Sequence, residues 1–353
     1  MVKLSYYEQH NAEVYEQFNE ILTNQLPYFC NEYFNGIDMR TSVLTKLNYA
    51  RDLAIFFDFL LKKIPFLTSK SIETLNLKDL DRLESSDIEY FLRYLSYYTY
   101  NGKYYKNAEK AKARKLSSVR SLFKYFYNKD KLSRDIASKV STPKLHEKPI
   151  IRLDDEEVET MLDSVESANK FGNSFQDAYN LNTRDRDIAI ISLLLATGIR
   201  VSELVGLNTD DIDYAKRSFR VTRKGGNISI LYYPEEIDDC LDNNLVWRKN
   251  RLLDRYDEEP ALFISLQNKR IGVRAVEKLV KKFSSIANPL KSVSPHKLRS
   301  TFGTALYRET KDIYVVAEVL GHKDVNTTKK HYAATSEEIK RLASEKVKLR
   351  KKP

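Results

Sequence analysis

The residues best suited to chemistry lie in the stretch from 294 to 332. It holds three of the five histidines of the chain, His296, His322 and His331. Histidine changes its charge near neutral pH, so a histidine cluster indicates chemistry more than packing. Arg299 follows His296 by three residues, a spacing that places both side chains on one face of a helix. Histidines, arginines and a tyrosine together would suit one anionic centre, a phosphate.

A second arginine, Arg200, stands just after a predicted buried helix in the run Ala-Thr-Gly-Ile-Arg-Val-Ser-Glu-Leu. Gly198 is expected to end that helix as a left-handed cap residue. Glu203 lies three residues after Arg200, so its carboxylate could hold the guanidinium and leave the other N–H groups for a phosphate. An ordinary surface ion pair is the alternative interpretation of this spacing.

Two further side chains could act at a phosphate. Lys224 precedes two glycines at a predicted hairpin tip, where a lysine can swing in and protonate a leaving oxygen. A solvated turn lysine is the alternative. Tyr332 could attack phosphorus, although a phenol with a pKa of about 10 needs proton removal or strongly positive neighbours. The chain has 23 tyrosines, so this residue alone is a weak signal.

The charge of the chain indicates an anionic partner. The formal net charge is +10 with 31% charged residues, a balance that suits nucleic acid. Residues 103–148 hold eleven lysines and three arginines against four acidic residues, together with several aromatic residues. This segment predicts a cationic face on a folded element, with a plain solvated surface as the alternative. The candidate DNA-binding side chains are Lys110, Arg114, Lys115, Arg120, Lys124 and Lys144.

The first part of the chain predicts a helical domain over residues 1–142. Only two of the ten glycines precede residue 172, and glycine is unfavourable inside helices. Two prolines then favour an extended linker over residues 143–152, which is itself basic. The candidate helices of this domain cover residues 5–25, 41–62, 86–99, 107–128 and 133–140.

Residues 153–336 predict a mixed α+β domain, so the expected fold class is mainly α with a small β-sheet or hairpin. Residues 184–197 are apolar nearly all round, which is typical of a buried helix. Alternating runs around a Gly-Gly pair predict a hairpin within residues 210–233. The segment 337–353 predicts a basic amphipathic helix that docks on a neighbouring protomer, with a disordered tail as the alternative. Further helices are expected at 235–253, 273–286, 296–309, 312–320 and 325–333.

Cysteine usage and hydropathy indicate a soluble cytoplasmic protein. Cys30 and Cys240 are the only cysteines, and neither belongs to a CxxC or Cys/His spacing, which argues against structural zinc. The sequence has no signal core and no run of eighteen apolar residues, so no membrane contact is expected. It also has no GxxxxGK[ST] loop and no acidic cluster with magnesium spacing near the motifs. No cofactor and no metal are therefore expected.

Taken in chain order, these motifs resemble the tyrosine recombinase/integrase family. The resemblance rests on Ala-Thr-Gly-Ile-Arg-Val-Ser-Glu-Leu, a hairpin lysine 24 residues after the arginine, His-x-x-Arg, Leu-Gly-His and a final tyrosine. It covers residues 150–335 by motif, whereas residues 1–145 match only in kind, as a helical and basic core-binding domain. Within the family the motifs are most similar to the Xer site-specific recombinases, and the length favours their single-recombinase (XerH-like) type.

The resemblance implies a role for each arginine of the site. Arg200 and Arg299 would bind the non-bridging oxygens of the scissile phosphate, and His322 would complete this pocket. Glu203 would support the site. Family members of this kind need neither a metal nor ATP.

The resemblance also implies the residues that transfer protons and attack. Lys224 would protonate the departing 5′-hydroxyl, and His296 would assist proton transfer to or from the nucleophile. Tyr332 would attack and form a 3′-phosphotyrosyl link. In the family the tyrosine most often stands nine positions after the Leu-Gly-His histidine, whereas here Tyr332 stands ten positions after His322. Counting nine leads to His331, which has no hydroxyl, so Tyr332 remains the expected nucleophile.

The implied activity is site-specific cutting and rejoining of double-stranded DNA by a homotetramer on two duplexes. A dif-type site, resolution of chromosome dimers at cell division, and a DNA translocase of the FtsK type as a partner are the expected context, on the nucleoid in the cytoplasm. The alternatives are a phage or genomic-island integrase, a type IB topoisomerase-like nicking and closing enzyme, and an architectural DNA-binding protein. The complete catalytic set argues against the last, because a binding protein needs no nucleophile.

Overall fold

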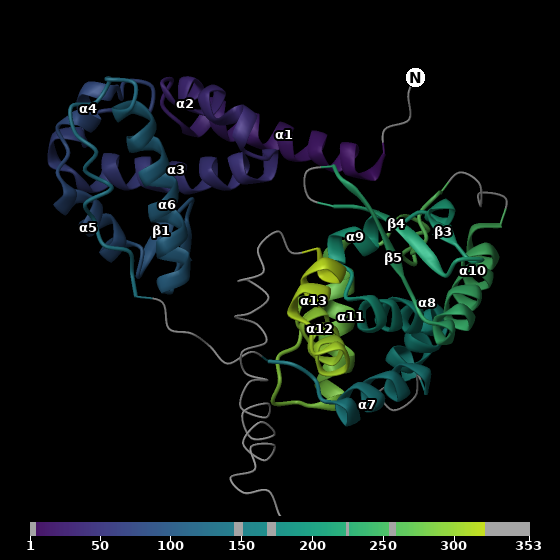
Figure 1. The fold of residues 1–353 in the computed structure, drawn as a ribbon. Helices are drawn as coiled ribbons and strands as arrows, with labels where there is room; N and C mark the ends of the chain where they lie inside the picture. Colours follow the sequence, from purple (N-terminus) through teal and green to yellow (C-terminus); the bar gives the residue numbers. More distant parts are fainter. Residues whose placement is uncertain (1–4, 145–150, 168–173, 224–225, 254–258, 322–353) are drawn as a thin grey trace, which may run out of the picture. The chain divides into compact units, whose positions relative to one another are not determined.

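The computed structural model describes residues 5–144, 151–167, 174–223, 226–253 and 259–321. The chain divides into two compact units, Met1–Lys148 and Pro149–Pro353, and the division falls within residues 143–152. Among these described residues, helices make up most of each unit, with one small antiparallel sheet in each (Figure 1). The predicted fold class, mainly α with a small sheet, is confirmed. The helix expected at 325–333 and the segment 337–353 lie outside the described residues.

The N-terminal unit is built around one central helix, α3 (Val43–Lys63). Three of its phenylalanines, Phe56, Phe57 and Phe59, are fully buried. The ring of Phe56 lies 5.1 Å from that of Phe91 and 6.4 Å from that of Phe123, both in edge-on contact. Such aromatic packing from three helices forms a core that holds them at fixed positions. The helices of this unit are α1 (Tyr6–Gln25), α2 (Cys30–Ile37), α3 (Val43–Lys63), α4 (Leu77–Asp81), α5 (Ser85–Tyr94) and α6 (Glu109–Tyr127).

The helix expected over residues 86–99 is wrong in its second half. Helix α5 ends at Tyr94, and a hairpin of β1 (Tyr98–Tyr100) and β2 (Lys103–Tyr105) follows. Asn101 and Gly102 at its tip have φ values of +48° and +71°. An Asn-Gly pair with both residues at positive φ forms the turn that joins two-residue hairpins, because its twist matches that of the strands.

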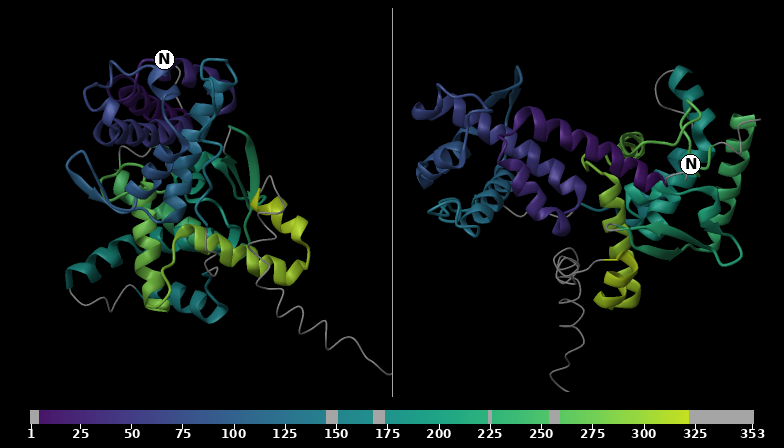
Figure 2. Two further views of the ribbon diagram at one scale, coloured as in Figure 1. Left: turned by 90° about the vertical axis from the view of Figure 1, so that its left-hand side faces the viewer. Right: turned by 90° about the horizontal axis from the view of Figure 1, so that it is seen from above.

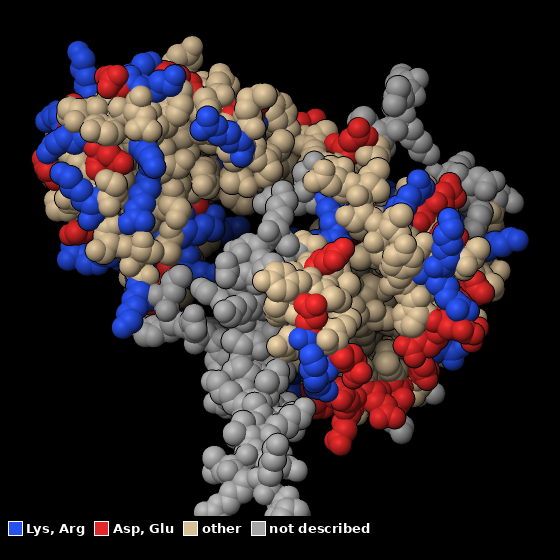
Figure 3. Space-filling model, viewed as in Figure 1, with Lys and Arg blue, Asp and Glu red and all other residues tan. Residues whose placement is uncertain are grey.

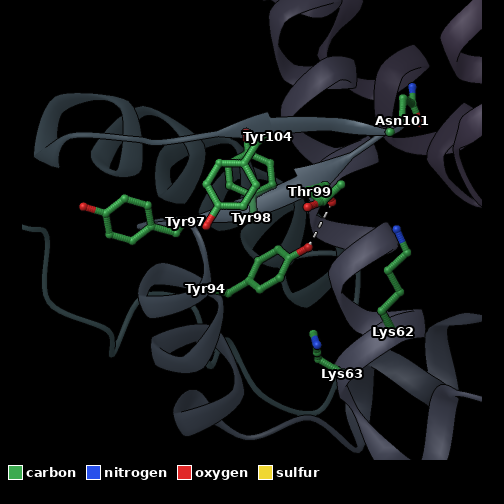
Figure 4. Close-up of a pocket in the computed structure, with 9 residues that line it drawn as sticks. Lys62, Lys63, Tyr94, Tyr97, Tyr98, Thr99, Asn101 and Tyr104 are labelled. Atoms are coloured by element: carbon green, nitrogen blue, oxygen red, sulfur yellow. Dashed lines mark hydrogen bonds between the residues drawn. The ribbon is translucent and has the colours of Figure 1, made fainter.

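This hairpin borders a pocket of about 340 Å³ in the N-terminal unit. Four tyrosines and two lysines contribute to its lining (Figure 4). One of them, Tyr94, donates its hydroxyl to Thr99 O at 3.4 Å. Burial raises the pKa of the Tyr94 phenol, so this hydroxyl stays a neutral donor.

The short helix expected at 133–140 is also absent, and turns occupy this segment. The side chain of Arg120 explains the difference. Its Nε donates to Ala137 O at 3.2 Å, and its Nη2 donates to Val140 O. Because these carbonyl groups accept from the arginine side chain, they need no backbone N–H from a helical turn. The segment can therefore keep Ile136 and Val140 buried without forming a helix.

The C-terminal unit surrounds one long helix, α8 (Ser174–Thr197). Its apolar segment 188–194 is buried, which confirms the predicted buried helix, although the helix begins earlier than expected. Five of the described α-helices contact it, and α12 (Pro295–Thr310) and α13 (Ile313–Leu320) lie side by side in both views of Figure 2. The other helices of this unit are α7 (Asp155–Glu166), α9 (Val201–Gly206), α10 (Asp238–Leu252), α11 (Val273–Ala287), α12 (Pro295–Thr310) and α13 (Ile313–Leu320).

A three-stranded antiparallel sheet completes this unit, with the order β3-β4-β5. Its strands are β3 (Ile212–Asp213), β4 (Ser218–Thr222) and β5 (Ile228–Tyr232). Phe219 pairs with Leu231, and both side chains face the core. The predicted hairpin is confirmed as β4 and β5, and its turn leads through residue 223 to Gly226.

Charge is distributed differently on the two units. On the face shown in Figure 3, lysines and arginines are spread over the N-terminal unit, whereas acidic side chains gather at the α7 end of the C-terminal unit. Helix α7 begins with a reciprocal cap, in which Asp154 and Glu157 each accept from the other's backbone N–H at 2.9 Å. Acids in a first helical turn complement the helix dipole. Within the described segments, no helix is long and apolar enough to cross a membrane.

Candidate active site

The turn after α8 sets the position of Arg200. Helix α8 ends at Thr197, and Gly198 follows with a left-handed φ of +59°, as predicted for the cap. The N–H of Gly198 donates to Leu194 O at 3.1 Å. A Cβ atom at this position would lie 2.5 Å from Cδ1 of Phe302 in α12. Both the backbone conformation and the packing therefore require glycine here.

Arg200 is then fixed by a buried carboxylate. Its backbone N–H donates to Oε2 of Glu203 at 3.1 Å, and its Nη1 donates to Oε1 at 2.8 Å. The Glu203 side chain is 3% exposed, and that of Arg200 is 35% exposed. Because both carboxylate oxygens accept from one residue, they hold its guanidinium in one orientation. The pair is therefore not an ordinary surface ion pair, which was the alternative.

Arg299 approaches the same turn from helix α12. Its side chain is buried, one helical turn after Pro295 at the start of the helix. Nη1 donates to Gly198 O, and Nη2 donates to Leu320 O. A buried guanidinium is tolerated when carbonyl groups accept from it. Arg299 thus connects the turn after α8 with the end of α13.

Three arginines meet at the carboxyl end of α13. Arg200 Nη2 donates to Gly321 O at 3.2 Å. Arg299 donates to Leu320 O. Arg223, one residue after β4, donates from Nη1 to the same Leu320 O at 3.0 Å. The last carbonyl groups of a helix lack partners within it and carry the negative end of the dipole, so they collect these cations at one point.

Arg223 was not among the site residues predicted from the sequence. Burial lowers the pKa of its guanidinium, the carboxylate of Glu203 raises it, and the charge of Arg200 lowers it. These influences show that the three groups lie in one electrostatic environment. The signal in the sequence was its place directly before Lys224 at a strand end, but arginines in turns are common. Only the fold distinguishes this one.

His296 lies in the first turn of α12, three residues before Arg299, as the sequence predicted. The histidine is exposed, whereas Arg299 is buried. Its carbonyl oxygen accepts from the hydroxyl of Ser300 at 3.1 Å. The start of the helix therefore carries a titratable side chain at the surface within one turn of a buried cation.

Three predicted site residues, Lys224, His322 and Tyr332, lie outside the described residues. Two of them directly follow residues already placed at the arginine cluster. In the sequence Lys224 comes after Arg223, and His322 comes after Gly321.

The predicted cationic face of α6 is only partly at the surface. Lys110, Arg114 and Lys124 of α6 are exposed, and so is Lys144, which lies beyond the helix. Lys115 is buried and pairs with Asp52 at 3.0 Å. This lysine therefore belongs to the core of the unit, because the fully buried Asp52 needs a cation close by.

Arg120 also differs from the expected outward position. It is half-buried and donates to the segment after α6, including Thr142 Oγ1 at 2.8 Å. Arg114 keeps half of its side chain exposed although it too pairs with Asp52, at 2.7 Å. Alternating cations along a helix do not reveal which of them face a buried acid on another helix.

Comparisons with known proteins identify related proteins over most of the chain. The model of the Phage integrase family matches residues 152–338. The tyrosine recombinase XerC of Caldanaerobacter subterraneus subsp. tengcongensis is 36% identical over 306 residues, which cover 84% of this chain and 79% of that protein. The tyrosine recombinase XerS of Streptococcus thermophilus is 30% identical over 328 residues, which cover 86% and 90%.

Solved structures share the fold at lower identity. The XerH site-specific recombinase bound to a palindromic difH substrate has a TM-score of 0.65 at 18% identity, covering 95% of this chain and 94% of that one. A lambda integrase dimer bound to a COC′ core site has a TM-score of 0.59 at 14% identity, covering 86% and 93%. The family resemblance in the sequence is confirmed. The chain belongs to the tyrosine recombinase family, whose members are enzymes that cut and rejoin DNA.

Proposed function

We propose that this protein is a site-specific DNA recombinase that cuts and rejoins double-stranded DNA through a 3′-phosphotyrosyl intermediate. The observation that carries the proposal is the convergence of Arg200 and Arg299 on the carboxyl end of α13. Phosphoryl transfer develops negative charge on the non-bridging oxygens, and preorganised guanidiniums stabilise that charge without reorganising during the reaction.

The two arginines have complementary parts in this proposal. The guanidinium of Arg200 donates hydrogen bonds to Glu203 and Gly321, and a third of its side chain stays accessible to a phosphate. A guanidinium has five N–H donors, so these two bonds leave others for one oxygen. Arg299 is more deeply buried and binds the second oxygen from the α12 side. His322 completes the phosphate pocket, as the family resemblance implies.

The reaction itself follows from the remaining predicted residues. Tyr332 Oη attacks phosphorus and gives up its proton with the help of His296. The P–O5′ bond breaks, and Lys224 protonates the departing 5′-oxygen. One phosphodiester is exchanged for another, so neither ATP nor an oxidant is consumed. The 5′-hydroxyl of a partner strand then attacks the phosphotyrosine and releases Tyr332.

The nucleophile can be tested by trapping the covalent intermediate. A duplex nicked close to the cleavage position loses its short 5′-hydroxyl fragment, so the protein–DNA adduct accumulates. The wild-type protein and His331→Ala are expected to form the adduct on candidate dif-type sites, and Tyr332→Phe is expected to form none. An adduct that persists in Tyr332→Phe would overturn the assignment of Tyr332 as the nucleophile. Loss of the adduct in His331→Ala would show that His331 is also needed for cleavage.

The cellular role proposed is the resolution of chromosome dimers at a dif-type site by a tetramer on two duplexes. The support is the similarity to proteins named XerC and XerS, and the shared fold of a XerH structure bound to difH. A DNA translocase of the FtsK type would switch the reaction on, and the basic segment 337–353 would dock on the next protomer. Crosslinking on DNA that traps only dimers would contradict the tetramer.

Two other functions use the same chemistry and can be separated by strand exchange. A phage or genomic-island integrase has some support from the fold shared with the Tn1549 transposon integrase, at a TM-score of 0.57. A type IB topoisomerase-like enzyme would nick and close one duplex. Two duplexes with different labels exchange strands only with a recombinase, and relaxation of a plasmid that lacks any target site indicates the topoisomerase. Dimer resolution predicts recombination between two copies of one chromosomal site, whereas an integrase recombines two different sites.

The helical N-terminal unit is proposed to hold the DNA on either side of the cleavage position. The exposed cations Lys110, Arg114, Lys124 and Lys144 are the candidates for phosphate contacts. Each phosphate contact releases about one counterion, so binding should weaken steeply with salt. A flat salt response would remove this part of the proposal.

A further inference from the structure

Arg223 closes the turn between β4 and β5 through its backbone. Its N–H donates to Asn227 O at 2.8 Å, and its carbonyl oxygen accepts from Gly226 N–H at 3.0 Å. Gly226 has a φ of +82°, which suits a tight turn. Lys224 stands in the sequence between these residues, so the backbone of Arg223 is the fixed point from which that lysine continues.

The side chain of Arg223 reaches the end of α13, nearly a hundred residues further along the chain. Nη1 donates to Leu320 O at 3.0 Å and Nη2 to Val319 O at 3.4 Å. The guanidinium rests directly on the Cα of Gly321, because a Cβ there would lie 1.2 Å from Nη1. Gly321 therefore provides both a left-handed helix cap and a seat for this arginine. His322 is the next residue of the chain.

This contact is electrostatically expensive. Burial lowers the pKa of the guanidinium, and Nε of Arg223 has no hydrogen-bond partner among the described residues. The cation also lies in the field of Arg200, with Glu203 as the nearby acid. A buried charge with an unpaired donor costs stability, so a contact with only a structural purpose would be better made by an apolar side chain. The cost is consistent with a functional purpose.

We propose that Arg223 is a positioning residue that locks the β4–β5 turn against the carboxyl end of α13. It thereby fixes where the chain segment of Lys224 starts relative to the arginine cluster that holds the phosphate. The inference rests on the proposed function, in which Lys224 protonates the leaving 5′-oxygen. Loss of the clamp displaces the general acid while Arg200 and Arg299 keep their own anchors.

A leaving group that needs no proton separates this role from a structural one. In a duplex whose bridging 5′-oxygen at the cleavage position is replaced by sulfur, a thiolate departs. A thiol has a pKa of about 8.5, so the thiolate leaves near neutral pH without a general acid. A defect caused only by a misplaced Lys224 must therefore disappear on this substrate, whereas a defect in phosphate binding or folding must remain.

The experiment measures single-turnover adduct formation by Arg223→Gln and Arg223→Lys on both substrates. Misplacement by about 1 Å costs about 100-fold, so Arg223→Gln should slow by roughly that factor on the ordinary phosphodiester. Its rate with sulfur should return to within about threefold of the wild-type rate on that substrate. Arg223→Lys keeps the charge but lacks the fork that spans two carbonyl groups, so its phosphodiester defect should be smaller and rescued alike.

Two controls keep the outcomes distinct. Arg308→Gln removes a partly exposed arginine of α12 that pairs with the exposed Asp155 of α7 at 3.0 Å, and it should match the wild type on both substrates. Lys224→Ala should itself be rescued by sulfur; if it is not, the proposed general acid fails. If Lys224→Ala is rescued and the folded Arg223 variants are not, or if they cleave the phosphodiester at the wild-type rate, the positioning role is overturned. Urea unfolding verifies that each variant is folded. If Arg223→Gln does not fold, the same comparison of the two substrates is made with Arg223→Lys.

Discussion

Glu203→Gln tests whether the buried carboxylate determines the geometry of Arg200. In the wild-type protein its two oxygens accept from the backbone N–H of Arg200 at 3.1 Å and from Nη1 at 2.8 Å. Glutamine keeps one acceptor oxygen and places an NH₂ group against a donor. The substitution preserves the shape of the side chain, so its effect comes from the lost charge and the mismatched hydrogen bond.

The expected size follows from burial. Leaving a buried polar group unpaired costs about 1–3 kcal/mol, and hydrogen bonds to charged groups contribute about 1.5–3 kcal/mol. Since Arg200 is 35% exposed, water can replace part of the loss, and we expect a decrease of about 2 kcal/mol in the free energy of unfolding. A guanidinium displaced by about 1 Å should slow cleavage about 100-fold.

Three measurements check this prediction, namely urea unfolding, equilibrium binding to a target duplex, and single-turnover adduct formation on a nicked duplex. The affinity for the target duplex should change by less than about threefold, because the interaction between Arg200 and the scissile phosphate strengthens mainly in the transition state. Glu235→Gln is the matched control, since Glu235 is 79% exposed and pairs with Arg217 at 3.1 Å. A wild-type cleavage rate in a destabilised Glu203→Gln protein would refute the positioning role of the carboxylate.

Three further predictions concern packing, charge and pH. Gly198→Ala should lower the free energy of unfolding by about 3 kcal/mol, because it adds backbone strain and overpacks the contact with Phe302. Gly102 also has a positive φ but lies in open space, so Gly102→Ala should lower it by only about 1 kcal/mol. Equal losses in urea unfolding would disprove the packing argument. Lys115→Met should lower the free energy of unfolding by about 2–3 kcal/mol because it breaks the buried pair with Asp52. Lys110→Met should leave the free energy of unfolding unchanged and reduce the salt slope of DNA binding by about one. A changed salt slope in folded Lys115→Met would contradict the burial of Lys115. Burial raises the pKa of Tyr233 to about 12, above the value of about 10 for an unfolded phenol, so its stabilising contribution is complete below about pH 10 and is lost toward about pH 12. Tyr233→Phe should therefore lose less stability than the wild type between about pH 9 and about pH 11, and parallel losses would count against this.

Features that depend on neighbouring residues could be predicted without the structure. The buried helix α8, the left-handed Gly198 and the β4–β5 hairpin follow from local periodicity and from the conformations that glycine allows. The pairing of Arg200 with Glu203 was expected from their spacing, since residues three apart meet on a helical turn. The Asn-Gly signal for the β1–β2 hairpin is also local, since both residues at its tip take a positive φ.

Features that depend on distant residues could not be predicted. Lys115 looked like a surface cation because nothing near it in the sequence indicates Asp52, which lies 63 residues away and is fully buried. Arg223 and Arg299 are ordinary arginines until α13 brings its last carbonyl groups between them. The residue types and their order determined the family and its chemistry. The tertiary structure decided which charges are buried and which meet, because burial and long-range pairing depend on how whole helices pack.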